Sequence, residues 1–156
     1  MNTLTKSLRT VAVVLAFTSA AFAKSGWVEN YEKGVEQAKK EGKIALVDFT
    51  GSDWCGWCIK LDKEVFSKAE FKKYAKENLV LIEIDFPQAR PLPKSKQEKH
   101  DALAKEYGIK GYPAVVLLDA TGKKIGQLGY MEGGPAAFIA AIEKAKGAAT
   151  PAAAAQ

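Results

Sequence analysis

Two cysteines, Cys55 and Cys58, have the residue type and spacing in this 156-residue chain to carry out chemistry. They follow Trp54 in the run WCGWC, which places Gly56 and Trp57 between them. The run follows a short apolar segment, and the next residues have helical periodicity, so Cys55 is expected at the start of a helix. There, unpaired backbone N–H groups and the helix dipole stabilise a thiolate. We expect Cys55 to be the attacking nucleophile and Cys58, about one turn later, to resolve the mixed disulfide.

Two other uses of a cysteine pair stay open on the sequence alone. A structural disulfide suits an oxidising compartment, although a bridge that closes so short a loop removes little entropy from the unfolded chain. A zinc site needs four ligands, and beyond the two cysteines only His100 offers a nitrogen donor. A C-x-x-C pair beside alternating strands and helices favours redox chemistry, without a metal or a cofactor. We expect His100 to be structural or solvent-facing.

The elements that must position the pair can be predicted from periodicity and breakers. Apolar runs predict two buried strands and then a hairpin. The pattern Ser67-Lys68-Ala69-Glu70 is typical of a capping box at a helix start. The expected strands are 44–49, 79–86, 114–118 and 124–129, and the expected helices are 28–41, 55–66, 67–78, 95–107 and 133–147. This order predicts an α/β fold, a mixed four-stranded sheet with helices on both faces.

The two ends of the chain have their own composition. Lys6 and Arg9 precede the apolar run 11–17, and small residues follow as far as Ala23, which is typical of a secretory signal peptide over residues 1–23. A membrane anchor is the alternative, but the apolar stretch is short and interrupted for a spanning helix. Residues 148–156 are rich in alanine and carry Pro151, so we expect a disordered tail after a domain at 24–147.

Composition excludes several classes of protein. With 47% apolar and 26% charged residues, the chain can bury one core, and two cysteines cannot form the framework of a disulfide-rich scaffold. Loss of the leader would lower the net charge from +5 to +3, and the lysines alternate with acids. This pattern lacks the basic footprint of a nucleic-acid-binding protein.

The run FTGSDWCGWC from Phe49 to Cys58, together with Gly111-Tyr112-Pro113, resembles the thioredoxin superfamily, specifically its secreted thioredoxin-like disulfide oxidoreductases. The resemblance spans roughly residues 44–146 and implies a thioredoxin-like fold. The helix at 28–41 matches less tightly, because no convincing strand precedes it.

The resemblance implies roles for three further residues. The peptide bond before Pro113 would be cis and stand opposite the cysteines, and the backbone of Tyr112 would pair with an extended substrate. Asp48 matches a buried acid that accepts a proton from the resolving thiol. This chain has one residue more than the usual pattern between Asp48 and Cys55, and Gly-Trp where thioredoxin has Gly-Pro. The family's reduction potential therefore cannot be transferred to it.

Aromatic residues indicate the substrate surface. Trp54 and Trp57 bracket Cys55, and Tyr112 is expected across from it, so the reactive sulfur would lie in an apolar patch of the kind that marks binding sites. The alternative is that Trp54 simply packs under its loop. The expected substrate-binding residues are Trp54, Gly56, Trp57, Tyr112 and Pro113.

We therefore expect an exported protein thiol–disulfide oxidoreductase, periplasmic or secreted, with reduction of protein disulfides as the favoured direction. Its partners would be protein thiols or disulfides and a redox partner, with no nucleic acid and no membrane insertion after leader cleavage. We expect a monomer. The alternatives are an oxidant or isomerase of the same fold, and a binding or chaperone module without catalysis.

Overall fold

The computed structural model describes residues 24–149. The predicted leader, 1–23, and residues 150–156 of the predicted tail lie outside the described residues. The elements are β1 (Trp27–Val28), α1 (Tyr31–Glu41), β2 (Ile44–Thr50), α2 (Gly56–Leu61), the π-helical turn η1 (Asp62–Phe66), α3 (Ala69–Asn78), β3 (Leu79–Asp85), α4 (Lys94–Glu106), β4 (Ala114–Leu118), β5 (Lys124–Leu128) and α5 (Gly134–Ala149). Helix α5 continues two residues past the domain boundary expected at residue 147.

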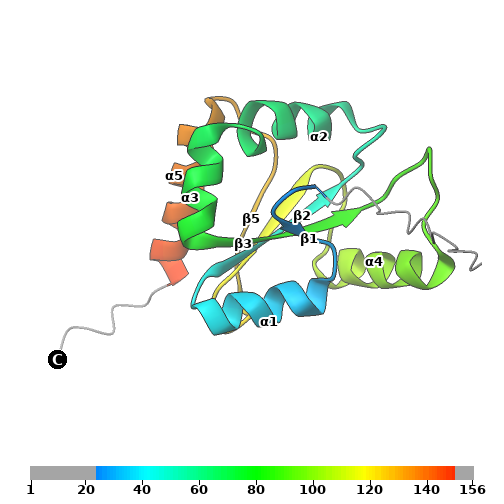
Figure 1. Cartoon of the computed structure of the whole chain (residues 1–156), viewed down its shortest axis with the longest axis horizontal. Coiled ribbons are helices and arrows are strands. Elements are labelled where there is room, and N and C mark those ends of the chain that lie inside the picture. Colours follow the sequence, from blue (N-terminus) through cyan, green and yellow to red (C-terminus); the bar gives the residue numbers. More distant parts are fainter. Residues whose placement is uncertain (1–23, 150–156) are drawn as a thin grey trace, which may run out of the picture.

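A mixed sheet in the order β1-β3-β2-β4-β5 forms the middle layer. Strands β1, β3 and β2 are parallel, while β4 and β5 are antiparallel additions, as the predicted hairpin requires. Figure 1 shows α1 and α4 on one side of the sheet and α2, α3 and α5 on the other. The predicted α/β architecture with both faces covered is confirmed, and parallel strands joined by crossover helices require that arrangement.

Alternating side chains of the central strand supply both cores. Ile44 and Leu46 of β2 pack with residues of α3 and α5, whereas Val47 and Phe49 pack with residues of α1 and α4. Because both faces of β2 are covered, all seven of its residues are buried, and from Ile44 to Phe49 its sequence is apolar except at Asp48. A charged residue in such a strand requires a special environment.

The sheet has five strands, so the prediction of four was wrong by one. The additional strand, β1, is only two residues long, which is too short for an alternation pattern to show in the sequence. Trp27 is buried and its ring lies 5.1 Å from that of Phe66, so tertiary packing holds this strand on the edge of β3. Helix α1 consequently begins at Tyr31, where the Asn30 side chain accepts a hydrogen bond from Lys33 N at 2.8 Å.

The segment after the cysteines is helical as predicted, but its hydrogen bonding changes at Asp62, where α2 gives way to η1. The Ser67 side chain donates to Asp62 Oδ2 at 2.9 Å, and its backbone N–H donates to Asp62 O at 2.8 Å. Ser67 thus ends η1. Helix α3 begins after Lys68 without a side-chain cap, so the predicted capping box is wrong although the helix exists.

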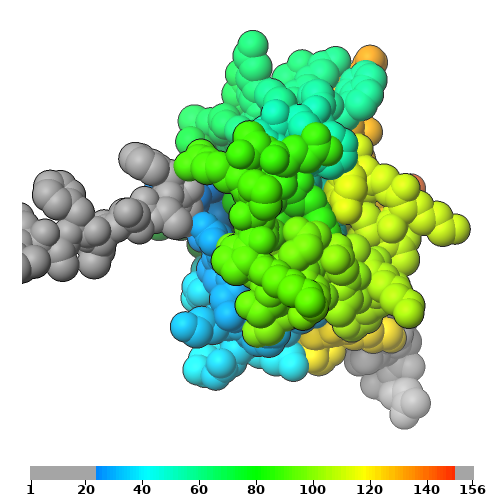
Figure 2. Space-filling model, turned by 90° about the vertical axis from the view of Figure 1, so that its right-hand side faces the viewer, coloured from blue at the N-terminus to red at the C-terminus, as the bar shows by residue number. Residues whose placement is uncertain are grey.

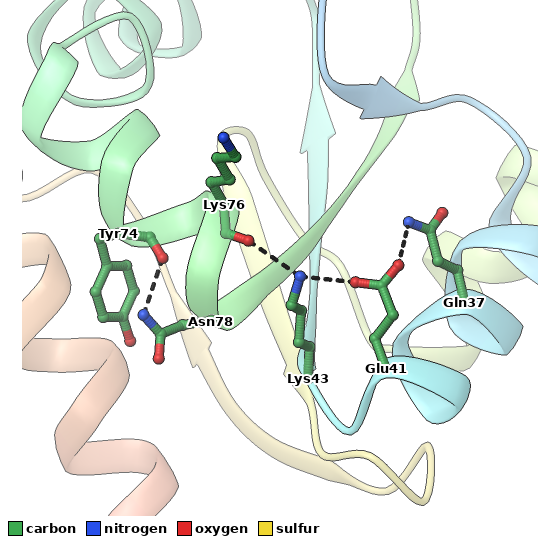
Figure 3. Close-up of polar contacts among 6 residues, drawn as sticks. All are labelled: Gln37, Glu41, Lys43, Tyr74, Lys76 and Asn78. Carbon is green, nitrogen blue, oxygen red and sulfur yellow. Dashed lines mark hydrogen bonds and ion pairs between the residues drawn. The ribbon is translucent and has the colours of Figure 1, made fainter.

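A polar cluster ties the helices together at the end of β2 away from the cysteines (Figure 3). Lys43, just before β2, donates to the backbone carbonyl of Lys76 at 3.0 Å and pairs with Glu41 at 2.7 Å. These contacts join the ends of α1 and α3 to the start of β2. Within residues 24–149, none of the helices combines the length and hydropathy that crossing a bilayer requires.

Candidate active site

Cys55 and Cys58 form a disulfide at the junction between β2 and α2. Cys55 is the N-cap of α2, and its sulfur accepts a hydrogen bond from Cys58 N at 3.2 Å. The N-cap position and this backbone donor would both stabilise negative charge on the Cys55 sulfur after reduction. Both cysteines are buried in the oxidised protein, with exposed fractions of 7% for Cys55 and 4% for Cys58.

The Trp54 indole lies over Gly51 in the loop before the cysteines. A Cβ at Gly51 would lie 2.4 Å from the ring, so only glycine allows this approach. The indole Nε1 donates to Phe86 O at 2.7 Å, yet the side chain remains 42% exposed. Both readings of Trp54 therefore hold in part, because it packs on its own loop and still presents apolar surface beside Cys55.

Hydrogen bonds join the same loop to the end of β3 and to the segment between β3 and α4. Ser52 donates to Asp85 through its backbone N–H at 2.9 Å and its hydroxyl at 2.6 Å. Asp53 accepts from the backbone N–H groups of Gln88 and Ala89 at 3.0 and 2.7 Å, and these bonds lower the pKa of Asp53. Figure 2 shows the green segment lying directly against the teal one that carries the cysteines. The loop is therefore held by charge-assisted bonds next to the reactive pair.

The Tyr112–Pro113 peptide bond is cis, as the resemblance implied. The Tyr112 ring meets the Trp54 ring edge to face, with centroids 5.8 Å apart, and lies 5.2 Å from the ring of Phe86. The segment before β4 is thereby brought beside the cysteine loop, over a sequence separation that no local pattern spans.

On its other side, the cysteine pair is flanked by Trp57, which is 57% exposed and lies 5.0 Å from the ring of Tyr130. Lys60 Nζ lies over both rings, 5.1 and 4.8 Å from their centroids. We refer to the five aromatic side chains around the disulfide, Trp54, Trp57, Phe86, Tyr112 and Tyr130, as the aromatic rim. The sequence analysis missed Phe86 and Tyr130, because they reach the site only through the fold.

Asp48 lies in β2, with an exposed fraction of 3% and with Oδ1 lacking a hydrogen-bond partner among the described residues. Burial raises the pKa of Asp48 to about 7, and Lys24 is the cation that opposes this shift. Asp48 and Cys58 line the same cavity, which has a volume of about 460 Å³. The buried carboxyl thus shares a cavity with the second cysteine, and burial brings its pKa close to neutrality.

Further charged residues that the sequence analysis missed line this cavity, among them Lys24, Asp62 and Glu83. Asp62 follows Cys58 by four residues, so helical spacing could have placed it on the same face. Glu83 stands opposite Asp48 in the β2–β3 register, and burial raises its pKa. Nothing in the sequence indicates that register, nor the return of Lys24 to the site.

His100 is buried and structural, which is one of the two placements expected for it. Its Nδ1 lies 2.8 Å from Asp85 O, its ring meets Phe86 edge to face, and burial lowers its pKa. Within residues 24–149, no group of three or more histidine, cysteine or acidic side chains has the arrangement of a metal site.

Comparison with known proteins finds a matching domain family and similar bacterial proteins. The thioredoxin-like domain family matches residues 31–146. The disulfide bond reductase DsbH of Chlamydia pneumoniae is 37% identical over 125 residues, which cover 80% of this chain and 75% of that protein. The thioredoxin-related protein DsbJ of Chlamydia pneumoniae is 30% identical over 103 residues, covering 66% of this chain but 30% of DsbJ.

A solved structure described as DsbH oxidoreductase superposes with a TM-score of 0.72 at 32% identity, covering 91% of this chain and 94% of that one. The family match, the fold and the disulfide at the start of α2 agree with one another. The chain belongs to the thioredoxin-like domain family and is a thiol–disulfide oxidoreductase with Cys55 and Cys58 as its redox-active pair.

Proposed function

We propose that this protein reduces disulfide bonds of protein substrates in an exported compartment, with Cys55 as the attacking thiolate and Cys58 as the resolving thiol. The position of the Cys55 sulfur, at the N-cap of α2 and bonded to Cys58 N, carries the proposal. The similarity to a disulfide bond reductase supports the direction of electron flow.

The proposed reaction proceeds by two thiol–disulfide exchange steps, the first at Cys55 and the second at Cys58. The Cys55 thiolate attacks one sulfur of the substrate disulfide, the substrate S–S bond breaks, and the released substrate thiolate takes up a proton. Cys58 then loses its proton and attacks the Cys55 sulfur, which releases the second substrate thiol. The substrate has gained two electrons and two protons, and the protein holds the Cys55–Cys58 disulfide, which a redox partner must reduce again.

Asp48 is the proton acceptor for Cys58 in this scheme. Its support is geometric, because both side chains line one cavity and Asp48 Oδ1 has no hydrogen-bond partner among the described residues. A carboxyl whose pKa lies at about 7 can both accept and release a proton near neutral pH.

The aromatic rim is the substrate surface in this proposal. Trp54, Trp57 and Ile59 are exposed large apolar side chains grouped around the disulfide, which suits extended protein segments with apolar side chains. The backbone of Tyr112 supplies the pairing groups for such a segment, with Gly56 and Pro113 beside it. The leader expected over residues 1–23 supports export to the periplasm or beyond. We expect the protein to act as a monomer.

Reduction of insulin disulfides tests the proposal. Wild-type protein supplied with a dithiol reductant should accelerate insulin reduction, and Cys55→Ser should fall to the rate of the reductant alone. Cys58→Ser should accumulate a mixed disulfide at Cys55, visible as an adduct by mass spectrometry. If the wild type does not exceed Cys55→Ser, the rim serves only to bind proteins.

The equilibrium potential of the pair decides the direction. A value of about −270 mV fits a reductant, whereas one of about −120 mV would make the protein an oxidant.

A further inference from the structure

Lys24 places its ammonium group against the acidic side of the active-site cavity. Its Nζ forms an ion pair with Asp62 and lies 4.3 Å from the Trp27 ring centroid and 5.0 Å from that of Phe66. The side chain is 27% exposed. Asp62, Trp27 and Phe66 together hold its ammonium group at the cavity wall. Contacts with two aromatic faces and a carboxylate give the head group a defined position.

Acids outnumber bases around this cavity. Its charged and titratable lining comes from the segment before β1, from β2, η1, β3 and α4, and from three connecting segments: Lys24, Glu29, Asp48, Asp53, Asp62, Glu83, Asp85, Arg90, Lys96 and His100. Two of the other cations interact with acids other than Asp48 and Glu83. Lys96 pairs with Glu29 at 2.8 Å, and Arg90 acts on Asp53.

Lys24 is the cation that acts on the buried acids. It opposes the effect of burial on the pKa of Asp48 and on that of Glu83, whereas Glu83, Asp62 and Asp85 add to it at Asp48. An opposite charge favours the ionised carboxylate, and like charges and burial disfavour it. Without Lys24, burial and the neighbouring Glu83, Asp62 and Asp85 would together favour the protonated acid at Asp48.

We propose that Lys24 is a positioning residue for the resolving step, because Asp62, Trp27 and Phe66 hold its ammonium group at the wall of the cavity that Asp48 and Cys58 also line. This inference rests on the proposed function of Asp48 as proton acceptor. A protonated Asp48 cannot take the Cys58 proton, so the mixed disulfide would persist longer and substrate release would slow. Lys24 acts through Asp48 and touches neither the substrate nor the sulfurs.

A carboxyl titration in the oxidised protein tests the coupling directly. In the full chain labelled with ¹³C at aspartate carboxyls, the Asp48 midpoint should lie at about pH 7 in the wild type and move to about pH 8 in Lys24→Met. Methionine keeps the apolar packing on Trp27 and Phe66. Lys24→Arg should restore the wild-type midpoint, and Lys96→Met, which removes a cation from the same cavity, should leave it unchanged.

Alkylation of Cys58 in the reduced Cys55→Ser variant tests whether Lys24 also affects the resolving thiol. The pH profile of Cys58 alkylation should move upward in Lys24→Met by the same amount as the Asp48 titration, and stay in place in Lys96→Met. An unchanged Asp48 midpoint in Lys24→Met overturns the inference, even where insulin reduction persists. Absence of insulin reduction with a shifted midpoint instead rejects the proposed function and leaves the Lys24–Asp48 coupling standing. If Lys24→Met does not fold, Lys24→Gln carries the same titration.

Discussion

Asp48 shows how a single side chain can bear on both stability and chemistry. It is buried in the central strand, and its pKa of about 7 lies well above the ordinary value of 3.8. Between these two pH values, the folded protein holds a proton that the unfolded chain has released. Stability therefore falls as pH rises from about 4 to about 7 and stays at the lower level above that range.

Replacing Asp48 with asparagine should remove this loss. Asp48→Asn should match the wild type near pH 4 and exceed it at pH 8, by up to about 4 kcal/mol in the free energy of unfolding. Urea unfolding of both oxidised proteins at the two pH values gives the difference, and all other titrating groups are common to the pair. The same advantage at pH 4 and pH 8 would show that Asp48 is not the group that titrates.

At the scale of elements, the site depends on how closely α1 and the cysteine loop approach the sheet. Gly34 of α1 faces β3, where a Cβ would lie 2.5 Å from Ile82 Cγ1. Ile82 is fully buried and cannot move aside freely. Helix α1 thus packs closely against β3. The same strand carries Glu83, which lines the active-site cavity.

Gly34→Ala should consequently lower the free energy of unfolding by about 1–3 kcal/mol, since overpacking outweighs the gain in helix propensity. Gly147→Ala in α5 is the matched control, because nothing lies within 4 Å of its Cβ position. That change should stabilise the protein by up to about 1 kcal/mol. Denaturant unfolding compares the two, and a stabilised Gly34→Ala would mean that α1 can lift from β3.

At the scale of the whole molecule, the α/β fold places an acidic cavity and an aromatic surface next to the disulfide. Both include residues that are distant in sequence, such as Lys24 and Tyr112. Under the proposed function, substrate proteins must have access to this aromatic surface.

Leader removal is a prediction that can be read from one terminus. Expression of the full chain in an exporting bacterium should yield a periplasmic protein that begins at Lys24, because the small residues up to Ala23 form the expected cleavage site. Amino-terminal sequencing and intact mass measure it. A cytosolic protein that retains residues 1–23 would contradict both the leader and the exported role.

The sequence alone determined the features that depend on neighbours along the chain. Continuous apolar runs predicted β2 and β3, since a strand covered on both faces needs apolar residues throughout. A cysteine pair at a strand-to-helix junction predicted the redox centre, because the helix start stabilises a thiolate wherever the helix is packed. The family resemblance added the cis peptide bond before Pro113.

Only the tertiary structure decided the rest. Strand β1 forms because Trp27 packs on Phe66, and its two residues have no pattern of their own. Glu83 faces Asp48 because of the β2–β3 register, which is set by packing across the sheet. Lys24 lies just before β1, which pairs with β3, and lines the cavity together with the acids. Periodicity and propensity describe neighbours in sequence, whereas the electrostatics of Asp48 depend on which distant charges the folded chain brings to it.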